Sequence, residues 1–449
     1  MKEENGMLLT EEHVIRCGRQ ERLFRKTDGY CYCSKNLYNS TNYLIVQCAR
    51  ISRKLKDGEI LDSWEKGLIH RINCAIHCYA RAGSSRKILH SIDENNGFIA
   101  DAYFLSWYLK QGKEFREMPY STCAQIVIQE LCRNWKSFYR SMEAWKKDPG
   151  AFSGKPGRPA YKDKEKGRNA LVLTYQNIKV DKDGKVRLPR FLDGIHIKAR
   201  HRDIRQVRIQ TGDGKIRIQL IYRSPVPALT GKKGIMGIDP GLDNLVTLCM
   251  DTSAEPVIIN GRGVKSINQY YNKRRASLGA VAAKSNSRKE TKRMRALTQK
   301  RNSRIKDAMH KVSRKVVQLA QENGVGMIVI GNNKGWKQNV KLGNRTNQEF
   351  VSIPYSRLIW QICYKAALAG IETRIVEESY TSGTSYIDEE YPERRCYDRS
   401  RRIKRGLFKS NNGILINADV NAAYQIMKKA GRTELRYKGM EKTVRLNVS

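Results

Sequence analysis

One strand–turn–strand unit, centred on Asp239, constrains this chain more than any other stretch. Residues 235–238 are apolar and predict a strand that ends at Asp239. Pro240-Gly241 predicts a tight turn, and the apolar run 245–248 predicts a second, antiparallel strand. A carboxylate at a strand end suits Mg²⁺, which prefers oxygen ligands and keeps positions open for a substrate phosphate. An aspartate that only caps its turn explains the stretch equally well.

The charge balance of the 449 residues indicates a polyanionic partner. Lys and Arg number 85 against 44 Asp and Glu, a formal net charge of +41, and a nucleic acid is the simplest explanation of that excess. No stretch approaches 18 uncharged apolar residues, so we expect no membrane span and no membrane partner. No apolar region follows the first residues, so we expect no signal peptide. The length is typical of two to four domains.

The cysteines argue against a disulfide framework. There are 11, an odd number, and no CxxC pair occurs. Cys74 and Cys78 lie one helical turn apart and are potential metal ligands, but we interpret them as thiols packed in a core.

The first half of the chain predicts a helical segment followed by a β segment. Residues 36–148 read as helical, with the clearest apolar stripe at 126–145. Residues 169–226 read as β, with a hairpin at 205–222. We expect this small barrel or sheet to include residues 1–35.

A Gly/Pro-rich basic linker, residues 149–168, joins the two segments. Lys155, Arg158 and Lys162 are its candidate phosphate contacts. A connector with no contact to nucleic acid is the alternative.

From residue 234 the pattern becomes mixed α/β. Residues 262–322 predict helix and carry 18 Lys and Arg against three acids, which favours nucleic-acid contact. An apolar stripe over 305–319 docks the second half of this region on a sheet. The candidate contacts here and further along are Arg288, Arg293, Arg301, Arg304, Lys334, Trp336, Lys337, Arg401 and Arg402.

The remaining pattern completes an ordered set of elements. A strand at 326–330, a helix at 355–369 and a strand at 373–376 precede a polar stretch, 383–412. A last helix carries Asp419 in its first turn, and we expect the chain beyond 431 to be weakly ordered. Three antiparallel strands, then helix, strand, helix, strand and helix, is the order of a ribonuclease H-like fold. Such folds gather acids around two divalent ions, and Asp239 and Asp419 fit the first and last of these positions.

The motifs, taken in order, resemble TnpB, an RNA-guided nuclease encoded by insertion sequences, and the related compact type V CRISPR effectors. The matching stretches are Gly237–Gly241, Trp135–Phe138, His310–Ser313, Tyr380–Ser382 and Asn417–Ala423.

The resemblance implies a multidomain α+β chain. Its parts are a RuvC-like nuclease of the ribonuclease H class, a small β-barrel wedge domain and an inserted helical recognition lobe. The implied boundaries are wedge 1–35, recognition lobe 36–148, linker and wedge 149–230, nuclease 231–382, a target nucleic-acid-binding insertion 383–412, nuclease 413–431 and tail 432–449.

The resemblance also implies a function. It predicts cleavage of double-stranded DNA chosen by a guide RNA and a short target-adjacent motif. It implies two Mg²⁺ ions, with Mn²⁺ as an alternative, and leaves open a second protein copy on the RNA. A cytoplasmic, nucleoid-associated prokaryotic protein is expected.

Two departures from the family pattern matter. The family usually places its second catalytic Glu at a position that is Gly331 here. We therefore expect Glu377 or Glu378 to supply that carboxylate, with Glu378 preferred, because alternation turns only one of the two towards the ions. Two surface acids and an inactive nuclease is the alternative. The insertion holds only Cys396 where the family usually has two CxxC pairs, so no zinc is predicted.

Two other functions compete with a guided nuclease. An RNA-guided DNA-binding repressor that does not cleave would need the same basic surface without the carboxylates. A guide-independent, structure-specific nuclease would need neither the helical lobe nor the basic linker.

Overall fold

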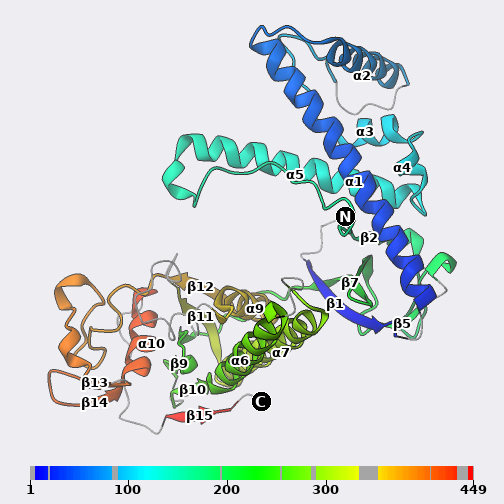
Figure 1. Cartoon of the computed structure of the whole chain (residues 1–449). Coiled ribbons are helices and arrows are strands. Elements are labelled where there is room, and N and C mark those ends of the chain that lie inside the picture. Colours follow the sequence, from blue (N-terminus) through cyan, green and yellow to red (C-terminus); the bar gives the residue numbers. More distant parts are fainter. Residues whose placement is uncertain are drawn as a thin grey trace. The chain divides into compact units, whose positions relative to one another are not determined.

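A computed structural model describes residues 6–18, 21–82, 89–192, 195–252, 255–284, 290–332, 352–404, 406–431 and 443–447. It contains two compact units, residues 6–224 and the unit from Pro225 onward (Figure 1). Among the helices in these ranges, none is long and apolar enough to cross a membrane.

The helical part of the first unit is built around a long helix, α1. The helices are α1 (Glu21–Lys56), α2 (Ser63–Arg81), α3 (Ala102–Leu109), α4 (Lys113–Arg116) and α5 (Ser121–Lys147). The stripe on α5 packs as its spacing predicts, with Ile128, Leu131 and Trp135 buried. Residues 1–35 were expected to join the sheet; β1 (Gly6–Arg16) does so, whereas the chain from Glu21 onward forms α1. Residues 31, 34, 37 and 38 are buried at helical spacing, and this packing decides the helix.

The β part of the first unit contains two sheets. Strands β1, β7 (Lys215–Pro225), β6 (Ile204–Gly212) and β2 (Leu171–Thr174) lie in that order in one sheet. Strands β3 (Lys179–Val180), β4 (Lys185–Arg187) and β5 (His196–Lys198) form the other. The predicted β6–β7 hairpin is confirmed, with Asp213 and Gly214 both at positive φ in its turn. The described strands of this part form a four-stranded and a three-stranded sheet, where a small barrel or sheet was expected.

The second unit is built on one six-stranded sheet. Its order is β12 (Glu372–Val376), β11 (Val325–Gly331), β8 (Gly234–Asp239), β9 (Asn244–Met250), β10 (Val257–Asn260) and β15 (Val444–Leu446). Strands β8, β9 and β10 are antiparallel neighbours, whereas β11 runs parallel to both β8 and β12. The tail beyond 431 was expected to be weakly ordered; its residues 444–446 form β15, which pairs in parallel with β10, and residues 432–442 lie outside the described ranges.

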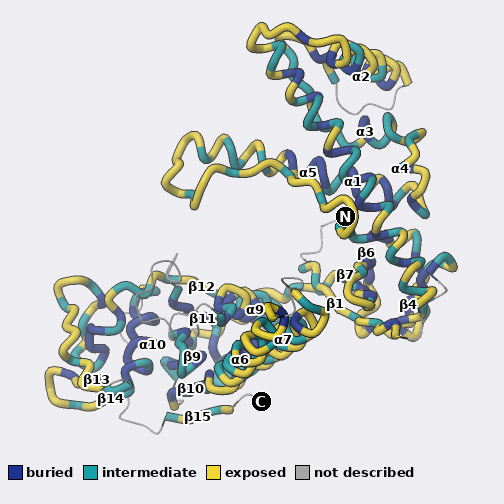
Figure 2. The backbone as a smooth tube through the Cα atoms, viewed as in Figure 1, coloured by how far each residue is buried: buried dark blue, intermediate teal, exposed yellow. Residues whose placement is uncertain are grey.

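Helices cover both faces of this sheet. Side chains from α7 (Lys292–Glu322) and α9 (Tyr355–Leu368) share one core with Met236, Ile238 and Ile330. Helix α6 (Arg262–Lys284) packs against α7. Helix α10 (Ala418–Lys429) packs on the opposite face, against Ile235 and Val329. Figure 2 shows α10 as one of the most deeply buried helices. Strand alternation therefore assigns odd-numbered positions of β8 and β11 to the α10 face.

The insertion 383–412 packs on α10 through a shared apolar core, which includes its Tyr386 and Phe408, and through hydrogen bonds. It contains β13 (Leu407–Lys409), which pairs with β14 (Leu415–Asn417), and two short 3-10 turns. Asn421 of α10 accepts a hydrogen bond from the amide of Tyr386 and donates one to the carbonyl of Thr384. The rings of Tyr386 and Tyr424 stack with centroids 4.5 Å apart. These contacts fix the insertion on the helix that carries Asp419.

Candidate active site

Asp239 and Gly331 lie side by side at the ends of two parallel strands. The β8–β11 register pairs Ile238 with Ile330, so the next residues along are Asp239 and Gly331. Both residues lie at odd-numbered positions and therefore face α10. Gly237, two residues before Asp239, has room for no side chain, because a Cβ there would lie 2.3 Å from the carbonyl oxygen of Ala423. The close approach of α10 to β8 places the helix next to Asp239.

Glu378 enters the space above Gly331. It follows β12, which pairs Val376 with Gly331. A Cβ built on Gly331 would lie 2.7 Å from Cγ and 3.0 Å from Oε1 of Glu378. The carboxylate of Glu378 therefore occupies the region that a side chain at position 331 would enter. Burial raises the pKa of Glu378 from 4.5 to about 7, and Lys429 opposes the rise.

Asp419 reaches the same region from α10. It lies in the first turn of the helix, where the Asn417 side chain caps the amides of Asp419 and Val420. One oxygen of Asp419 accepts a hydrogen bond from Nδ2 of Asn244 at 2.7 Å. The other lies 3.5 Å from Nη2 of Arg402. Asn244 of β9 and Arg402 of the insertion thus both contact this carboxylate.

The three acids interact electrostatically. The pKa of Asp239 is raised well above its ordinary value, first by burial and then by the negative charges of Glu378 and Asp419; Arg402 opposes the shift. The pKa of Tyr355 is raised by burial and by Asp239, Asp243 and Glu378. The carboxylates of residues 239, 378 and 419 therefore lie near enough for the last two to affect the first, and each of the three residues is partly buried.

The donor chemistry of this group suits a hard dication, but its spacing as it stands does not form a closed metal site. Within the described residues, no three His, Cys, Asp or Glu side chains lie close enough together to hold an ion. Asp419 is engaged by Asn244 and Arg402 instead. Side-chain rotation is therefore needed before these acids share an ion.

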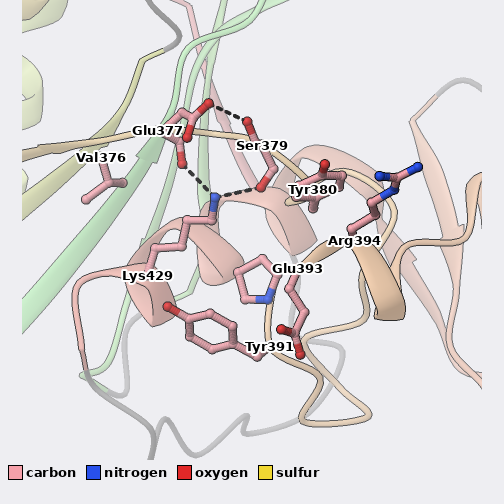
Figure 3. A pocket seen from close by; sticks show the side chains of 9 residues that line it. Val376, Glu377, Ser379, Tyr380, Tyr391, Glu393, Arg394 and Lys429 are labelled. Atoms are coloured by element: carbon pink, nitrogen blue, oxygen red, sulfur yellow. Dashed lines mark hydrogen bonds between the residues drawn. The ribbon is translucent and has the colours of Figure 1, made fainter.

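Glu377 points away from this group. Its side chain accepts a hydrogen bond from the hydroxyl of Ser379 at 2.6 Å and lines a separate pocket with Tyr380 and Arg394 (Figure 3). Lys429 donates to the main-chain carbonyls of Glu377 and Ser379, at 2.9 and 2.6 Å. The two carbonyls flank Glu378 in the sequence, so Lys429 restrains the segment that carries Glu378.

The candidate nucleic-acid contacts fall into four groups. Lys155, Arg158, Arg293 and Arg304 are exposed, and Lys162 is half-buried beside the ring of Tyr38. Arg301 donates to Asn268, Asn302 and the carbonyl of Ser352, so its donors are used internally. Arg401 pairs with Glu390 at 2.6 Å, and Arg402 with Asp419. Arg288, Lys334, Trp336 and Lys337 lie outside the described residues.

Sequence reasoning missed three residues near the carboxylates. Asn244 holds Asp419, Lys429 holds the segment around Glu378, and Tyr355 donates to the carbonyl of Gly241 at 2.7 Å in the turn after Asp239. Asn244 is the first residue of β9 and follows the turn after Asp239. Tyr355 is the first residue of α9 and Lys429 is the last residue of α10. Neither position is distinctive in the sequence of an amphipathic helix.

The fold and the site define a multidomain protein of mixed helix and sheet, with an acidic group at the strand ends of its central sheet. Two segments match known families. Residues 219–337 match the OrfB_IS605 family, described as a probable transposase, and residues 355–426 match the Cas12f1-like TNB domain. These two segments are thus similar to the TnpB transposase family and to Cas12f1-like proteins, which confirms the resemblance seen in the motifs.

Solved structures give weaker similarities. One described as a Cas12f1–sgRNA–target DNA complex is 16% identical, with a TM-score of 0.34, and covers 93% of this chain and 98% of that one. A CRISPR-Cas12f ternary complex is 15% identical, with a TM-score of 0.36, and covers 88% and 81%. A Cas12i–crRNA–dsDNA complex is 11% identical, with a TM-score of 0.30, and covers 41% and 34%. No curated protein matches the chain.

Proposed function

We propose that this protein is an RNA-guided DNA endonuclease whose chemistry is carried out by Asp239, Glu378 and Asp419. The observation that carries the proposal is geometric: Glu378 lies over Gly331, the strand register puts Gly331 beside Asp239, and Asn244 of the next strand holds Asp419. The two family matches cover the segments that contain all three residues. The net charge of +41 supports RNA and DNA as partners.

The sheet topology supports a ribonuclease H-like, RuvC-type assignment of the second unit. Strands β8, β9 and β10 form an antiparallel meander, and β11 and β12 extend the other edge in parallel with β8. In this arrangement the first strand is central, and its carboxyl end lies beside the ends of β11 and β12. The proposed acids occupy that edge, with α10 supplying the third.

Asp239, Glu378 and Asp419 would hold the divalent ions, and Mg²⁺ is the proposed metal, with Mn²⁺ as an alternative. Bound ions would supply a Lewis acid and an activated water for phosphodiester hydrolysis. The protein's own contribution is to set the orientation of the acids. Asn244 and Lys429 restrain Asp419 and the Glu378 segment, and Arg402 offsets part of the acidic charge.

The insertion 383–412 is proposed to bind target nucleic acid without zinc. Its Cys396 thiol lies 3.9 Å from a carboxylate oxygen of Glu393. Its apolar side chains Tyr386 and Phe408 pack on α10, and Asn421, Gln425 and Lys428 of the helix add hydrogen bonds.

The proposal is tested with the full chain purified together with its copurifying RNA. We expect Mg²⁺-dependent cleavage of a DNA duplex that matches the guide segment of that RNA. Asp239→Ala and Asp419→Ala should abolish cleavage while the affinity for the duplex stays within a few fold. Guide-dependent binding without cleavage would overturn the nuclease proposal in favour of a repressor, and cleavage of branched DNA without RNA would overturn guidance.

A further inference from the structure

The linker between the helical and β parts of the first unit is an ordered strap bound to α1. We define the strap as residues 154–168. Asn39 of α1 forms two hydrogen bonds with the main chain of Lys162, donating to its carbonyl at 2.8 Å and accepting from its amide at 2.9 Å. Asn42 donates to the carbonyl of Pro159 at 3.0 Å. Lys35 donates to the carbonyl of Lys164 at 2.6 Å. The strap therefore has one defined path along the helix.

This attachment uses buried polar groups, which are costly to place in a protein interior. Lys35 is 2% exposed, and its ammonium group also lies 3.8 Å from the ring centre of Tyr32. Asn42 also accepts a hydrogen bond from the indole of Trp135 at 2.9 Å, which ties the strap to α5. A connector that only spans a gap would not require a buried lysine and a buried asparagine, Asn42, to hold it. The structure instead holds the strap in a fixed position.

Because the strap is fixed by its main chain, most of its basic side chains are left in solvent. The exposed cations are Lys155, Arg158, Lys164 and Lys166. Asp163 is directed to the strap itself, since one of its oxygens accepts hydrogen bonds from the amides of Glu165 and Lys166. The outward face of the strap is consequently cationic.

Two exposed tyrosines accompany this cationic face. Tyr43, on α1 beside Asn39 and Asn42, is 49% exposed, and Tyr161, in the strap, is 45% exposed. Tyr161 lies between Pro159 and Lys162, which Asn42 and Asn39 bind, and Tyr43 follows Asn42 on α1. The pKa of Tyr161 agrees with this placement, since it is raised by burial and by Tyr43 and lowered by Arg158. Large aromatic faces that remain in water beside guanidinium groups are the components of a stacking platform for nucleic acid.

We propose that Tyr43, Tyr161 and Arg158 form a binding site for single-stranded nucleic acid, and that Asn39, Asn42 and Lys35 are its positioning residues. The inference rests on the proposed function, because it assigns part of the guided nuclease's RNA or DNA contact. Unpaired bases stack on the tyrosines, and Arg158 and the neighbouring lysines contact the phosphates. A duplex keeps its base faces inside the helix, so it gains only the phosphate contacts.

The first test is photocrosslinking of the full chain, in EDTA, to a 20-nucleotide single-stranded RNA that carries 5-iodouridine. We expect crosslinked peptides that contain Tyr43 and Tyr161. The double variant Tyr43→Ala/Tyr161→Ala should lose at least about tenfold in affinity for this RNA, and much less for a duplex of equal length. Tyr103→Ala, which removes a more exposed tyrosine from α3, is the matched control and should change neither.

The second test addresses the positioning residues. Asn39→Ala should lower the crosslinking yield at Tyr161 several fold and flatten the dependence of RNA affinity on salt. Asn73→Ala is its control, because Asn73 makes the same pair of hydrogen bonds with the main chain of Ile92. Equal effects of the two variants would overturn the positioning role. Crosslinks at other tyrosines only, or equal loss of duplex binding in the double tyrosine variant, would overturn the site.

These measurements need no cleavage and no metal. Failure of the stacking site therefore leaves the nuclease proposal standing, and a protein that never cuts DNA can still pass both tests. A change in oligomeric state on Tyr43→Ala/Tyr161→Ala, with RNA affinity unchanged, would reassign this surface to contact with a second copy of the chain and so overturn the proposal.

Discussion

The side chain of Glu378 lies over Gly331, and the two positions compete for one volume. A Cβ on Gly331 would come within 2.7 Å of Cγ of Glu378. A glutamate in the segment after β12 and a glutamate at the end of β11 are thus two ways to deliver a carboxylate to the same place. This overlap is the steric reason why a glutamate at position 378 can replace one at position 331, as the sequence suggested.

Gly331→Ala should therefore displace Glu378. The added methyl group would also lie 2.6 Å from Cδ1 of Ile426, and overpacking of this kind costs about 1–3 kcal/mol of stability. We expect a lower melting temperature and slower cleavage. The informative variant is Gly331→Glu/Glu378→Ala, which should recover part of the cleavage lost in Glu378→Ala. A folded double variant no more active than Glu378→Ala would contradict the shared volume.

Glu378 and Glu377 should differ sharply as catalytic residues. Glu378→Gln removes one proposed metal ligand, and we expect cleavage to fall at least about a hundredfold, since such a ligand contributes several kcal/mol to the transition state. Glu377→Gln is the adjacent control and should retain most activity, because its side chain is directed to Ser379. Cleavage rates under single-turnover conditions check both, and a reversed order would assign the role to Glu377.

Lys429 should affect cleavage through the segment it restrains. Lys429→Met removes two hydrogen bonds to main-chain carbonyls, each worth about 1.5–3 kcal/mol when the donor is charged. We expect slower cleavage with unchanged affinity for the guide-matched duplex. Lys429→Arg keeps a charged donor and should recover part of the rate. Equal loss in the two variants would argue that the site requires the lysine for another reason.

The pH dependence of stability should reveal Glu378. Its pKa is raised by burial from 4.5 to about 7, so between these values the folded protein keeps a proton that the unfolded chain has released. The free energy of unfolding therefore falls as the pH rises through this window. Glu378→Gln, which cannot ionise, should be about as stable as the parent at pH 4.5. Above pH 7 it should be more stable, by roughly 3 kcal/mol at about 1.4 kcal/mol per pKa unit.

Urea unfolding in EDTA at pH 4.5 and pH 8 checks this expectation. Adding Mg²⁺ at pH 8 should stabilise the parent more than Glu378→Gln, because ion binding offsets the buried charge. A stability difference that does not change with pH would show that Glu378 is already ionised in the folded protein at pH 4.5.

Local patterns predicted the sheet of the second unit well. The strands around Asp239 and the strand at 326–330 form where their apolar runs indicate, because a strand buried on both faces needs an uninterrupted apolar sequence. The proximity of Asp239, Glu378 and Asp419 depends on strand order and on the packing of α10. Apolar periodicity carries no information about either, so their gathering was expected only from the order of elements and the resemblance.

Polar contacts were the least predictable part. Arg402 and Arg401 belong to an Arg-rich stretch, and composition alone indicates a phosphate surface; the structure pairs them with Asp419 and Glu390. The start of α1 was missed because residues 21–35 bury Thr27, Cys31 and Ser34, which are small and weakly apolar. A helix face of this kind shows little hydrophobic periodicity, so only its packing partners reveal it.

The pairing of β15 with β10 has a consequence for the sheet as a whole. Without it, β10 would be an edge strand with unpaired amide and carbonyl groups, and such a strand can pair with other chains and cause aggregation. Residues 444–446 pair with that edge and cover it. Deleting them should leave the carboxylates in place but make the purified protein self-associate. A chain shortened by these residues would therefore lose solubility before it lost activity.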